Sequence, residues 1–262
     1  SKLAPALEQL PRLQAMHWMA TDSIARELSE QWRDPGIDGN SIAFLQYTSG
    51  STSAPRGVIV SHRNILHNQK LIQLGMEHTE RSIVVSWLPF YHDMGLLGTV
   101  LQPLYVGFPC VLMSPMAFLQ RPVRWLQAIT RYRATTSGAP NFAYDRCVNK
   151  VTAEQRAELD LSSWDMAFNG SEQVHAETLE RFTTAFAPCG FRLQTFYPCY
   201  GLAEATLVVS GGKKAFPPQV ETFQAEALKQ GFVVDDSSTA HQTKKLVGCG
   251  QPLGDQKVVI VD

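Results

Sequence analysis

Residues 41–74 read SIAFLQYTSGSTSAPRGVIVSHRNILHNQKLIQL, and the rest of the chain keeps to the alternation that this stretch begins. Ser41–Tyr47 is an apolar run that predicts a strand, and Gly57–Val60 predicts a second, short strand. Ser61 is a favourable N-cap residue and predicts a helix that continues to about Leu74. A polar loop separates the two strands. Strand, polar loop and helix in this order are typical of α/β proteins.

Strands and helices continue to alternate beyond this stretch. The further expected strands are Ser82–Trp87, Cys110–Met113, Ala134–Ser137, Met166–Phe168 and Leu193–Phe196. The further expected helices are residues 1–33, Met94–Val106, a helix that starts at Pro122, Asn141–Val151 and His175–Ala187. This order predicts an α/β fold with a largely parallel sheet flanked by helices. In such sheets ligands bind in the loops that follow the carboxyl ends of strands, so chemistry is expected there.

The composition argues against several classes of protein. A chain of 262 residues is long enough to bury a core without disulfides or a structural metal. Its 23 Lys and Arg against 24 Asp and Glu give a net charge of −1, which argues against bulk binding to nucleic acid. Charged residues make up only 18% of the chain. The usual fraction in soluble domains is roughly 25%, so extensive buried surface or a large interface is expected.

The cysteines indicate a reducing environment. Their number, five, is odd, and the chain contains no C-x-x-C pair. We therefore expect reduced thiols in a cytoplasmic protein, not a disulfide framework or a zinc site. The N-terminus also lacks the basic start and apolar core of a signal peptide.

Met94–Gln120 contains no charged residue, and its length alone would permit a membrane span. Three prolines and three glycines divide this stretch into pieces that are too short to cross a bilayer. A buried helix followed by a buried strand is therefore expected, and a membrane segment is the alternative.

The loop Tyr47–Gly57 contains hydroxyl residues and a glycine directly after a strand, with Arg56 near its end. Backbone N–H groups and hydroxyls in such a loop can surround a phosphate, and an arginine can neutralise its charge. The spacing is not that of a Walker loop. Composition alone leaves a plain Ser/Gly linker as the alternative.

Four motifs, in this order, resemble those of the adenylate-forming superfamily of acyl-CoA synthetases, luciferases and peptide-synthetase adenylation domains. They are Tyr47–Val58 followed by Ser61-His62, then Leu88–Leu96, Asn169–Glu172 and Tyr200–Thr206. Within that superfamily, the wording of His92–Leu96, Pro115–Phe118, Ser137–Tyr144 and Tyr200–Thr206 resembles the fatty acyl-AMP ligases. The resemblance implies that a fatty acid and ATP give acyl-adenylate and pyrophosphate. It also implies that the acyl group then passes to the phosphopantetheine thiol of an acyl carrier protein.

The resemblance also implies roles for individual residues. Glu204 matches the family's glutamate ligand of Mg²⁺, a hard cation that prefers oxygen ligands. His92 matches a histidine near the substrate carboxylate and the phosphates, and Arg56 supplies charge in the phosphate loop. Residues expected to contact the nucleotide are Thr48, Ser49, Gly50, Ser51, Thr52, Gly170, Ser171, Glu172, Tyr200, Gly201 and Thr206. Without the resemblance, Glu204 would be taken as solvated, Tyr200 as core packing and His92 as an ordinary hydrogen-bonded residue.

The uncharged stretch after Asp93 gains a role in the same way, because an acyl chain needs apolar walls. The residues expected at an acyl-binding tunnel are Met94, Gly95 and Leu96, with Phe142 and Ala143 opposite. Plain core packing explains the same residues equally well.

The chain departs from the superfamily pattern at three positions. Ala203 stands where a threonine usually precedes the metal-binding glutamate, and Thr206 is proposed to replace that hydroxyl. Arg56 replaces the commoner lysine, and Ser53 replaces a frequent glycine.

The expected organisation has four segments. Residues 1–40 are a helical lead-in, and 41–212 are the α/β subdomain that binds ATP and the acyl group. The polar residues 213–245 are the candidate for a family-specific insertion, and 246–262 begin the next, smaller β subdomain. No match to the family's ribose-binding aspartate or C-terminal catalytic lysine is found. We therefore expect a fragment of a larger ligase whose partners include the missing N-terminal and C-terminal parts.

The sequence thus predicts an ATP- and Mg²⁺-dependent fatty acyl-AMP ligase, weak or inactive as a fragment, with no membrane span. A fatty acyl-CoA synthetase is the alternative enzyme, since it shares the ATP motifs. A non-catalytic nucleotide-binding module is the alternative from another class.

Overall fold

The computed structural model describes residues 16–20, 23–48, 56–235 and 242–261. The chain divides into two compact units, Ser1–Asp38 and Gly39–Asp262. In the described part of the first unit, the 3₁₀ helix η2 (Arg26–Gln31) buries no residue. The expected helix over residues 1–33 is therefore wrong for most of the described residues in that range. A helix that packs no apolar face on a core is marginal in water, which accounts for the difference.

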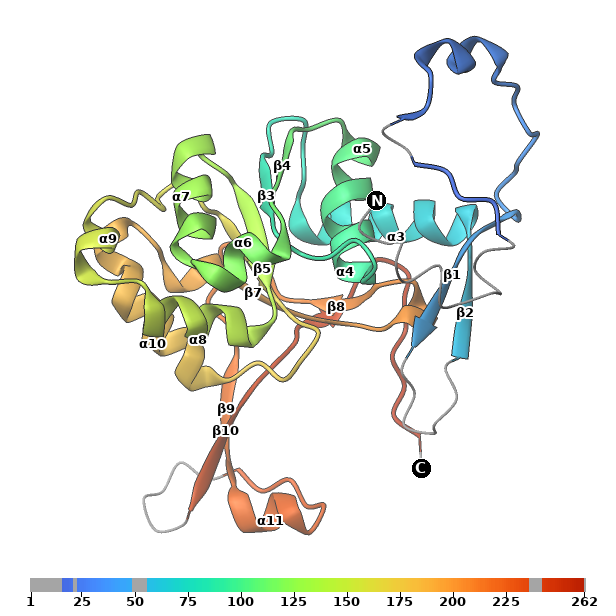
Figure 1. Ribbon diagram of the computed structural model, residues 1–262. Helices are drawn as coiled ribbons and strands as arrows, with labels where there is room; N and C mark the ends of the chain where they lie inside the picture. The colour runs from blue at the N-terminus through green and yellow to red at the C-terminus, as the bar shows by residue number, and fades with distance from the viewer. Residues whose placement is uncertain (1–15, 21–22, 49–55, 236–241, 262) are drawn as a thin grey trace. The chain divides into compact units, whose positions relative to one another are not determined.

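The second unit is built on a seven-stranded sheet (Figure 1). Its strands are β3 (Val84–Ser86), β4 (Cys110–Leu112), β5 (Thr136–Ala139), β6 (Met166–Asn169), β7 (Phe196–Gly201), β8 (Val208–Gly211) and β11 (Gln251–Pro252). Their order is β11-β8-β7-β6-β5-β3-β4. The strands from β4 to β7 run parallel, and β8 and β11 are antiparallel additions. The predicted α/β class and the largely parallel sheet are confirmed.

Helices cover this sheet as the alternation predicted. The longer ones are α3 (His62–Met76), α7 (Val123–Tyr132), α8 (Asn141–Lys150) and α10 (Ala176–Phe186). The shorter ones are α4 (Asp93–Leu96), α5 (Gln102–Val106), α6 (Pro115–Gln120), α9 (Ala153–Ala157), η4 (Ala187–Cys189), η5 (Leu193–Thr195) and η6 (Ala203–Ala205). A π-helical turn, η3 (Leu97–Leu101), joins α4 to α5. Ser61 caps α3 as predicted, accepting from the backbone N–H of Asn64.

Aromatic side chains fill the core between the sheet and helices α7, α8 and α10. Trp125, Tyr144, Trp164 and Phe182 are fully buried, and four of their pairs meet edge to face, with Trp125 and Trp164 ring centroids 5.4 Å apart. Tyr144 and Trp164 are stacked. Edge-to-face geometry is favourable for aromatic pairs. All four residues of β5 and all four of β6 are buried, as expected for central parallel strands covered on both faces.

Two local predictions are wrong. Cys110–Met113 was expected to be buried, but β4 is half exposed because it forms the edge of the sheet. The strand expected at Leu193–Phe196 starts only at Phe196, after the 3₁₀ turn η5. In the segment 246–261, Gln251–Pro252 adds β11 to the large sheet, and Val258–Val261 form no strand.

Two antiparallel pairs stand apart from the large sheet. The first is β1 (Ile42–Thr48) with β2 (Arg56–Ser61), whose connection lies outside the described residues. The second is β9 (Val220–Gln224) with β10 (Thr243–Val247), which forms an arm with α11 (Ala225–Lys229) at its end (Figure 1). This arm occupies the segment 213–245 that the sequence singled out. Among the described residues, no helix is both long enough and apolar enough to span a membrane.

Candidate active site

A cavity of about 470 Å³ opens beside the carboxyl ends of β6 and β7. The β1 strand, the start of α4 and the loop after β7 form its walls. Its lining residues are Gln46, Tyr47, Thr48, Ile72, Met76, His92, Asp93, Met94, Gly98, Phe168, Ser171, Cys199, Tyr200, Gly201, Leu202, Ala203, Glu204, Leu207 and Val208. This is the edge of the sheet where ligands bind in parallel α/β folds.

The cavity brings together residues from all four sequence motifs. The predicted site residues in its lining are Thr48, His92, Met94, Ser171, Tyr200, Gly201 and Glu204. Arg56 is exposed and pairs with Thr48 across the β1–β2 hairpin, outside the lining. Ser49, Gly50, Ser51 and Thr52 lie outside the described residues. Gly170 is buried against Cys199, where a Cβ atom would lie 2.8 Å from the carbonyl oxygen.

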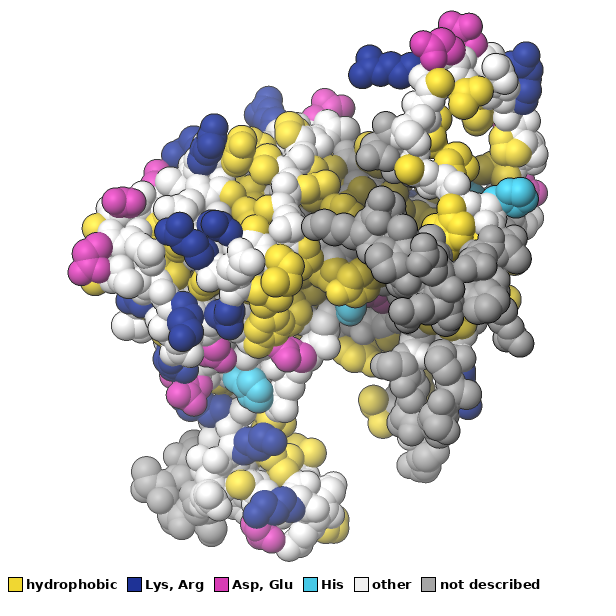
Figure 2. Space-filling model, in the orientation of Figure 1, with side chains coloured by type: hydrophobic (Ala, Val, Ile, Leu, Met, Phe, Trp, Pro, Cys, Tyr) yellow, Lys and Arg dark blue, Asp and Glu magenta, His cyan; other side chains and the backbone are white. Residues whose placement is uncertain are grey.

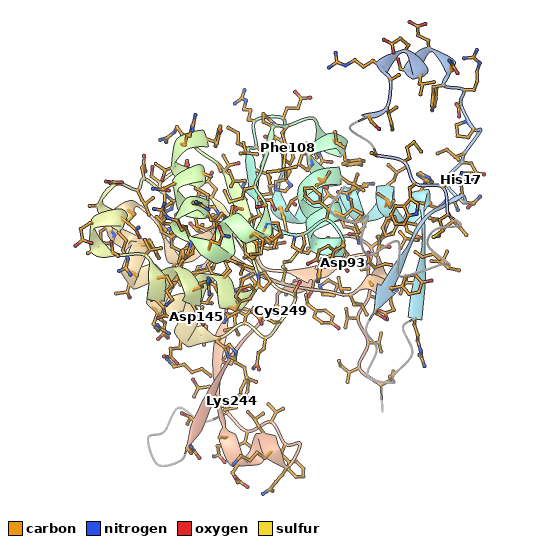
Figure 3. The ribbon with its side chains drawn as sticks, viewed as in Figure 1. His17, Asp93, Phe108, Asp145, Lys244 and Cys249 are labelled. Atoms are coloured by element: carbon orange, nitrogen blue, oxygen red, sulfur yellow. The ribbon has the colours of Figure 1, made fainter. Side chains whose placement is uncertain are left out.

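His92 lies at the N-terminus of α4 beside Asp93, which Figure 3 labels. Its Nδ1 is 2.8 Å from Asp93 Oδ1 and 3.2 Å from the backbone nitrogen of Met94. The shorter contact favours a proton on Nδ1 donated to Asp93, which also accepts from the Met94 N–H at 2.6 Å. The hydrogen bond to Asp93 raises the pKa of His92, while partial burial opposes the rise. His92 therefore keeps its positive charge to a higher pH than a free histidine.

The loop after β7 presents Glu204 to the cavity. The short helix η6 (Ala203–Ala205) carries this exposed glutamate, and Thr206 follows with φ 73° and ψ −54°. A β-branched residue rarely adopts a positive φ, so the loop is strained at this point. Gly201 permits the tight return, since a Cβ atom there would lie 1.9 Å from the carbonyl oxygen of Leu207. Thr206 itself is largely buried and outside the lining, so the structure does not bring the proposed replacement hydroxyl to the cavity.

The loop after β6 connects this cavity to the start of α8. Ser171 has φ 68°, and its hydroxyl is 3.3 Å from the sulfur of Met94. The neighbouring Glu172 accepts a 2.6 Å hydrogen bond from the backbone N–H of Phe142. Glu172 was expected at the nucleotide, but its carboxylate is directed to α8 and lies outside the lining of the cavity.

A second, smaller cavity of about 210 Å³ adjoins the first. Its lining is almost entirely apolar: Trp87, Leu88, Pro89, Tyr91, His92, Met94, Gly95, Pro115, Leu119, Pro140 and Phe142. Figure 2 shows hydrophobic side chains gathered on the surface between α4, α6 and α8, the elements that form it. Among the described residues, His92 and Met94 line both cavities.

The second cavity contains three of the five residues expected at an acyl tunnel: Met94, Gly95 and Phe142. Leu96 and Ala143 line neither cavity, and Ala143 is fully buried in the core. Leu96 and Ala143 therefore stay predictions, and neither is a lining residue of the two cavities.

Sequence reasoning missed two residues of this site. Asp93 was noted only as the neighbour of His92, although a carboxylate next to a histidine is a signal for a charge pair. Asn68, on α3, holds the loop that carries Glu204 through hydrogen bonds to Ala205 and Val208. The sequence signal that could have identified Asn68 is a polar residue on the same helix face as the apolar residues Leu71 and Ile72.

A comparison with family models matches residues 2–262 to AMP-binding enzymes. The chain belongs to the AMP-binding enzyme family. It is 49% identical over 94% of its length to the medium-chain-fatty-acid–[acyl-carrier-protein] ligase JamA of Moorena producens, and it covers 42% of that protein. It is 46% identical over 93% of its length to the corresponding ligase TtuA of Teredinibacter turnerae, of which it covers 38%.

Solved structures give the same relationship. A crystal structure of a fatty acyl-adenylate ligase from Legionella pneumophila, in complex with acyl adenylate and pyrophosphate, matches with a TM-score of 0.84 and 48% identity. The match covers 89% of this chain and 41% of that one. The predicted resemblance to fatty acyl-AMP ligases is thus confirmed, and this member of the AMP-binding family spans about two-fifths of the length of these relatives.

Proposed function

We propose that the protein carrying this chain activates a fatty acid with ATP, giving acyl-adenylate and pyrophosphate, and then transfers the acyl group to an acyl carrier protein. The observation that carries the proposal is the junction of the two cavities. The larger cavity, which contains Glu204 and exposes the more polar surface of the two (the polar cavity), and the smaller cavity with Phe142 (the apolar cavity) share the wall formed by His92 and Met94. A carboxylic acid with an apolar chain and a nucleotide would meet at this wall.

The chemistry needs no nucleophile from the protein. An oxygen of the substrate carboxylate attacks the α-phosphorus of ATP, and the bond to the β-phosphate breaks with its electron pair leaving on pyrophosphate. The carboxylate is already ionised at neutral pH, so no general base is needed. Catalysis then consists of positioning the two substrates and stabilising the negative charge that develops.

His92 suits the second of these tasks. With its Nδ1 proton bonded to Asp93, the protonated ring has an Nε2–H left to donate to a carboxylate or phosphate oxygen. The raised pKa keeps a larger fraction of the ring charged near neutral pH. We assign to His92 the orientation of the substrate carboxylate beside the α-phosphate.

Glu204 fits a magnesium site in which the substrate supplies some of the metal ligands. Mg²⁺ is commonly held by one or two carboxylates together with substrate phosphates and water. Glu204 is exposed at the cavity, and among the described residues no hydrogen-bond donor or cation pairs with it. When bound, the metal neutralises charge on the phosphate oxygens. Glu204 would hold it, and Thr48, Tyr200 and Gly201 would line the space for the nucleotide.

The apolar cavity supports a fatty acid as the substrate class. Burial of each CH₂ group in apolar surroundings is worth about 0.8 kcal/mol, so affinity should grow with each carbon that the walls enclose. The ligases JamA and TtuA both act on medium-chain fatty acids, by their names. We therefore propose a medium-chain acid, an acyl carrier protein as the acceptor and a cytoplasmic location.

The proposal is tested by ATP–pyrophosphate exchange in the full-length protein that carries these residues, whether that is this chain or a longer one. Exchange should require a fatty acid and Mg²⁺, and Glu204→Ala should lower it on the order of tenfold or more. Glu221→Ala, which removes an exposed carboxylate on β9 away from both cavities, is the matched control. A Glu204→Ala protein with the wild-type rate of pyrophosphate exchange would contradict a role for Glu204 as a metal ligand. Abundant acyl-CoA when CoA is supplied would favour an acyl-CoA synthetase instead.

A further inference from the structure

Asn68 is a buried amide whose side-chain hydrogen bonds, within the described structure, all go to one distant loop. It lies on α3 and is 1% exposed. Its Nδ2 donates to the carbonyl oxygens of Ala205 and Val208, and its Oδ1 accepts from the Val208 N–H, each at 3.2 Å. The amide orientation is fixed by chemistry, because carbonyls require the NH₂ group and the backbone N–H requires the oxygen.

The loop that Asn68 holds is the one that presents Glu204. Three backbone bonds tighten the loop: Ala205 N to Leu202 O at 3.0 Å, Thr206 N to Ala203 O at 2.8 Å and Leu202 N to Leu207 O at 2.9 Å. The strained residue Thr206 lies between the two residues that Asn68 contacts. Strained backbone persists only where the surroundings over-determine it, and Asn68 supplies contacts on both sides.

Glu204 depends on this backbone for its position. Within the described part of the chain, no side chain bonds to its carboxylate, so the turn alone sets where the carboxylate points. The loop is exposed to solvent at Glu204. On its other side the Gln256 side chain also donates to the carbonyl oxygen of Val208, at 3.1 Å, but Asn68 is the side chain that bonds on both sides of Thr206 in the described structure.

We propose that Asn68 is a positioning residue for the adenylation reaction, which fixes the strained 202–208 loop so that Glu204 faces the polar cavity. This inference rests on the proposed function. Asn68 touches neither substrate nor metal in this scheme, and it acts only through the loop.

The neighbouring Gln69 provides a matched control. It is also an amide on α3 and also 1% exposed, but its Nε2 donates to the carbonyl oxygen of Leu97 at 3.1 Å. Asn68→Ala and Gln69→Ala each remove one buried amide from the same helix. Only Asn68→Ala removes hydrogen bonds to the Glu204 loop. Both variants can therefore lower stability, but only Asn68→Ala should change the position of Glu204.

The first measurement is ATP–pyrophosphate exchange in the full-length protein that carries these residues. Asn68→Ala should lower kcat on the order of 10- to 100-fold and raise the Mg²⁺ concentration needed for half-maximal rate, with little change in KM for the fatty acid. Gln69→Ala should keep the wild-type Mg²⁺ dependence. An Asn68→Ala protein with wild-type Mg²⁺ dependence, or one that matches Gln69→Ala in every parameter, would overturn the inference.

Asn68→Asp adds a readout that a merely structural role would not give. The new carboxylate can accept from the Val208 N–H but repels the carbonyl oxygens of Ala205 and Val208. Protonation restores one donor, so the activity of Asn68→Asp relative to wild type should recover as the pH falls. A ratio that does not change with pH would contradict the proposed hydrogen bonds.

Hydrogen–deuterium exchange separates this inference from the proposed function. Exchange of the amides in residues 202–208 should be faster in Asn68→Ala and unchanged in Gln69→Ala. If wild type catalyses no pyrophosphate exchange, the proposed function fails, yet the amide measurement still tests the loop. If the loop is equally protected in Asn68→Ala, the positioning role fails even in an active enzyme.

Discussion

At the residue scale, the charge of His92 depends on one neighbour. The side chain of Asp93 is 11% exposed and accepts both the His92 ring proton and the Met94 N–H, so its carboxylate is held in place against the imidazole. Because the bond to Asp93 is the largest cause of the raised pKa, any role for His92 as a cation should depend on Asp93.

Asp93→Asn should therefore move the alkaline limb of the pH–rate profile to lower pH. The protonated form of His92 is present below its pKa, so activity that needs the cation falls as the pH rises through that value. Removal of the carboxylate lowers the pKa of His92 and brings the fall to lower pH. The profile of pyrophosphate exchange measures this, and Asp165→Asn, an exposed carboxylate outside both cavities, is the control. Identical pH–rate profiles for Asp93→Asn and wild type would show that His92 is not the group whose titration sets the alkaline limb.

His78 makes the fold sensitive to acid. It is 4% exposed, its Nε2 is 3.2 Å from the hydroxyl of Thr136, and its Nδ1 has no partner among the described residues. Burial, assisted by the charge of Lys214, lowers the pKa of His78 to about 4. Between this value and the ordinary value near 6.5, the unfolded chain binds a proton that the folded chain does not. Stability is therefore lost as the pH falls through this window.

The loss should reach roughly 3 kcal/mol at pH 4 and below, because each pKa unit corresponds to 1.36 kcal/mol. His78→Gln should remove most of the slope of unfolding free energy against pH between 6.5 and 4. Urea unfolding at several pH values gives this slope, and His175→Gln on an exposed histidine controls for the loss of one imidazole. A slope that persists in His78→Gln would assign the acid sensitivity to other groups.

The sequence could identify residues whose chemistry is written in a motif but not residues that act through the backbone. Glu204 and His92 stand in recognisable strings, and the structure places both at the cavity. Asn68 lies 137 residues from the carbonyl of Ala205 that it binds, so only the fold brings the two together. Glu172 also stands in a motif, yet its carboxylate accepts a hydrogen bond from the start of α8 and does not line the polar cavity.

At the element scale, α8 begins at the apolar cavity and takes its cap from another loop. Pro140, its N-cap residue, has no side chain that can accept a hydrogen bond. Glu172 accepts the N–H of Phe142 in its place, and its charge also complements the positive end of the helix dipole. The bond links the Ser171 loop of the polar cavity to Phe142 in the apolar cavity.

Glu172→Ala should lower the free energy of unfolding by about 1 kcal/mol, the typical cost of a lost cap. Glu172→Gln keeps an acceptor but loses the charge, and it should cost about 0.5 kcal/mol. Both should raise KM for ATP and for the fatty acid together, because one contact orders both walls. Urea unfolding and exchange kinetics give these values, and Gln173→Ala on the next, exposed residue is the control. A change in KM for only one of the two substrates would contradict the idea that this hydrogen bond orders both cavity walls.

Elements were predictable from sequence where local and tertiary forces agree. The capped helix α3 and the central strands β5 and β6 were found because hydrophobic pattern, turn residues and burial coincide there. The lead-in was not, because the 3₁₀ helix η2 buries no residue, and a helix without a packed apolar face is marginal in water. The exposure of β4 was also not predictable, because strand order decides which strand forms the edge and the pattern of one strand does not contain that order.

At the scale of the whole molecule, the β9–β10 arm is attached to the body but contributes little to its core. Phe232 and Val233, near its end, are 65% and 73% exposed, and Lys244, labelled on the arm in Figure 3, is also exposed. The arm meets α10 through the exposed ion pair of Lys245 with Glu180, whose charged atoms are 3.0 Å apart. Exposed pairs of this kind contribute at most about 1 kcal/mol.

Removal of the distal arm should therefore leave the body folded. Glu221 and Leu246 face each other across the hairpin, so an Asn-Gly turn between them can replace residues 222–245 without a change of register. The free energy of unfolding of this variant, measured in urea, should lie within about 1 kcal/mol of wild type. Leu253→Ala is the contrast, since Leu253 packs against the core next to β11 and its truncation should cost about 2 kcal/mol. If the shortened protein lost several kcal/mol or its cooperative transition, the arm would be part of the body, because only shared burial could transmit so large an effect from a hairpin so exposed.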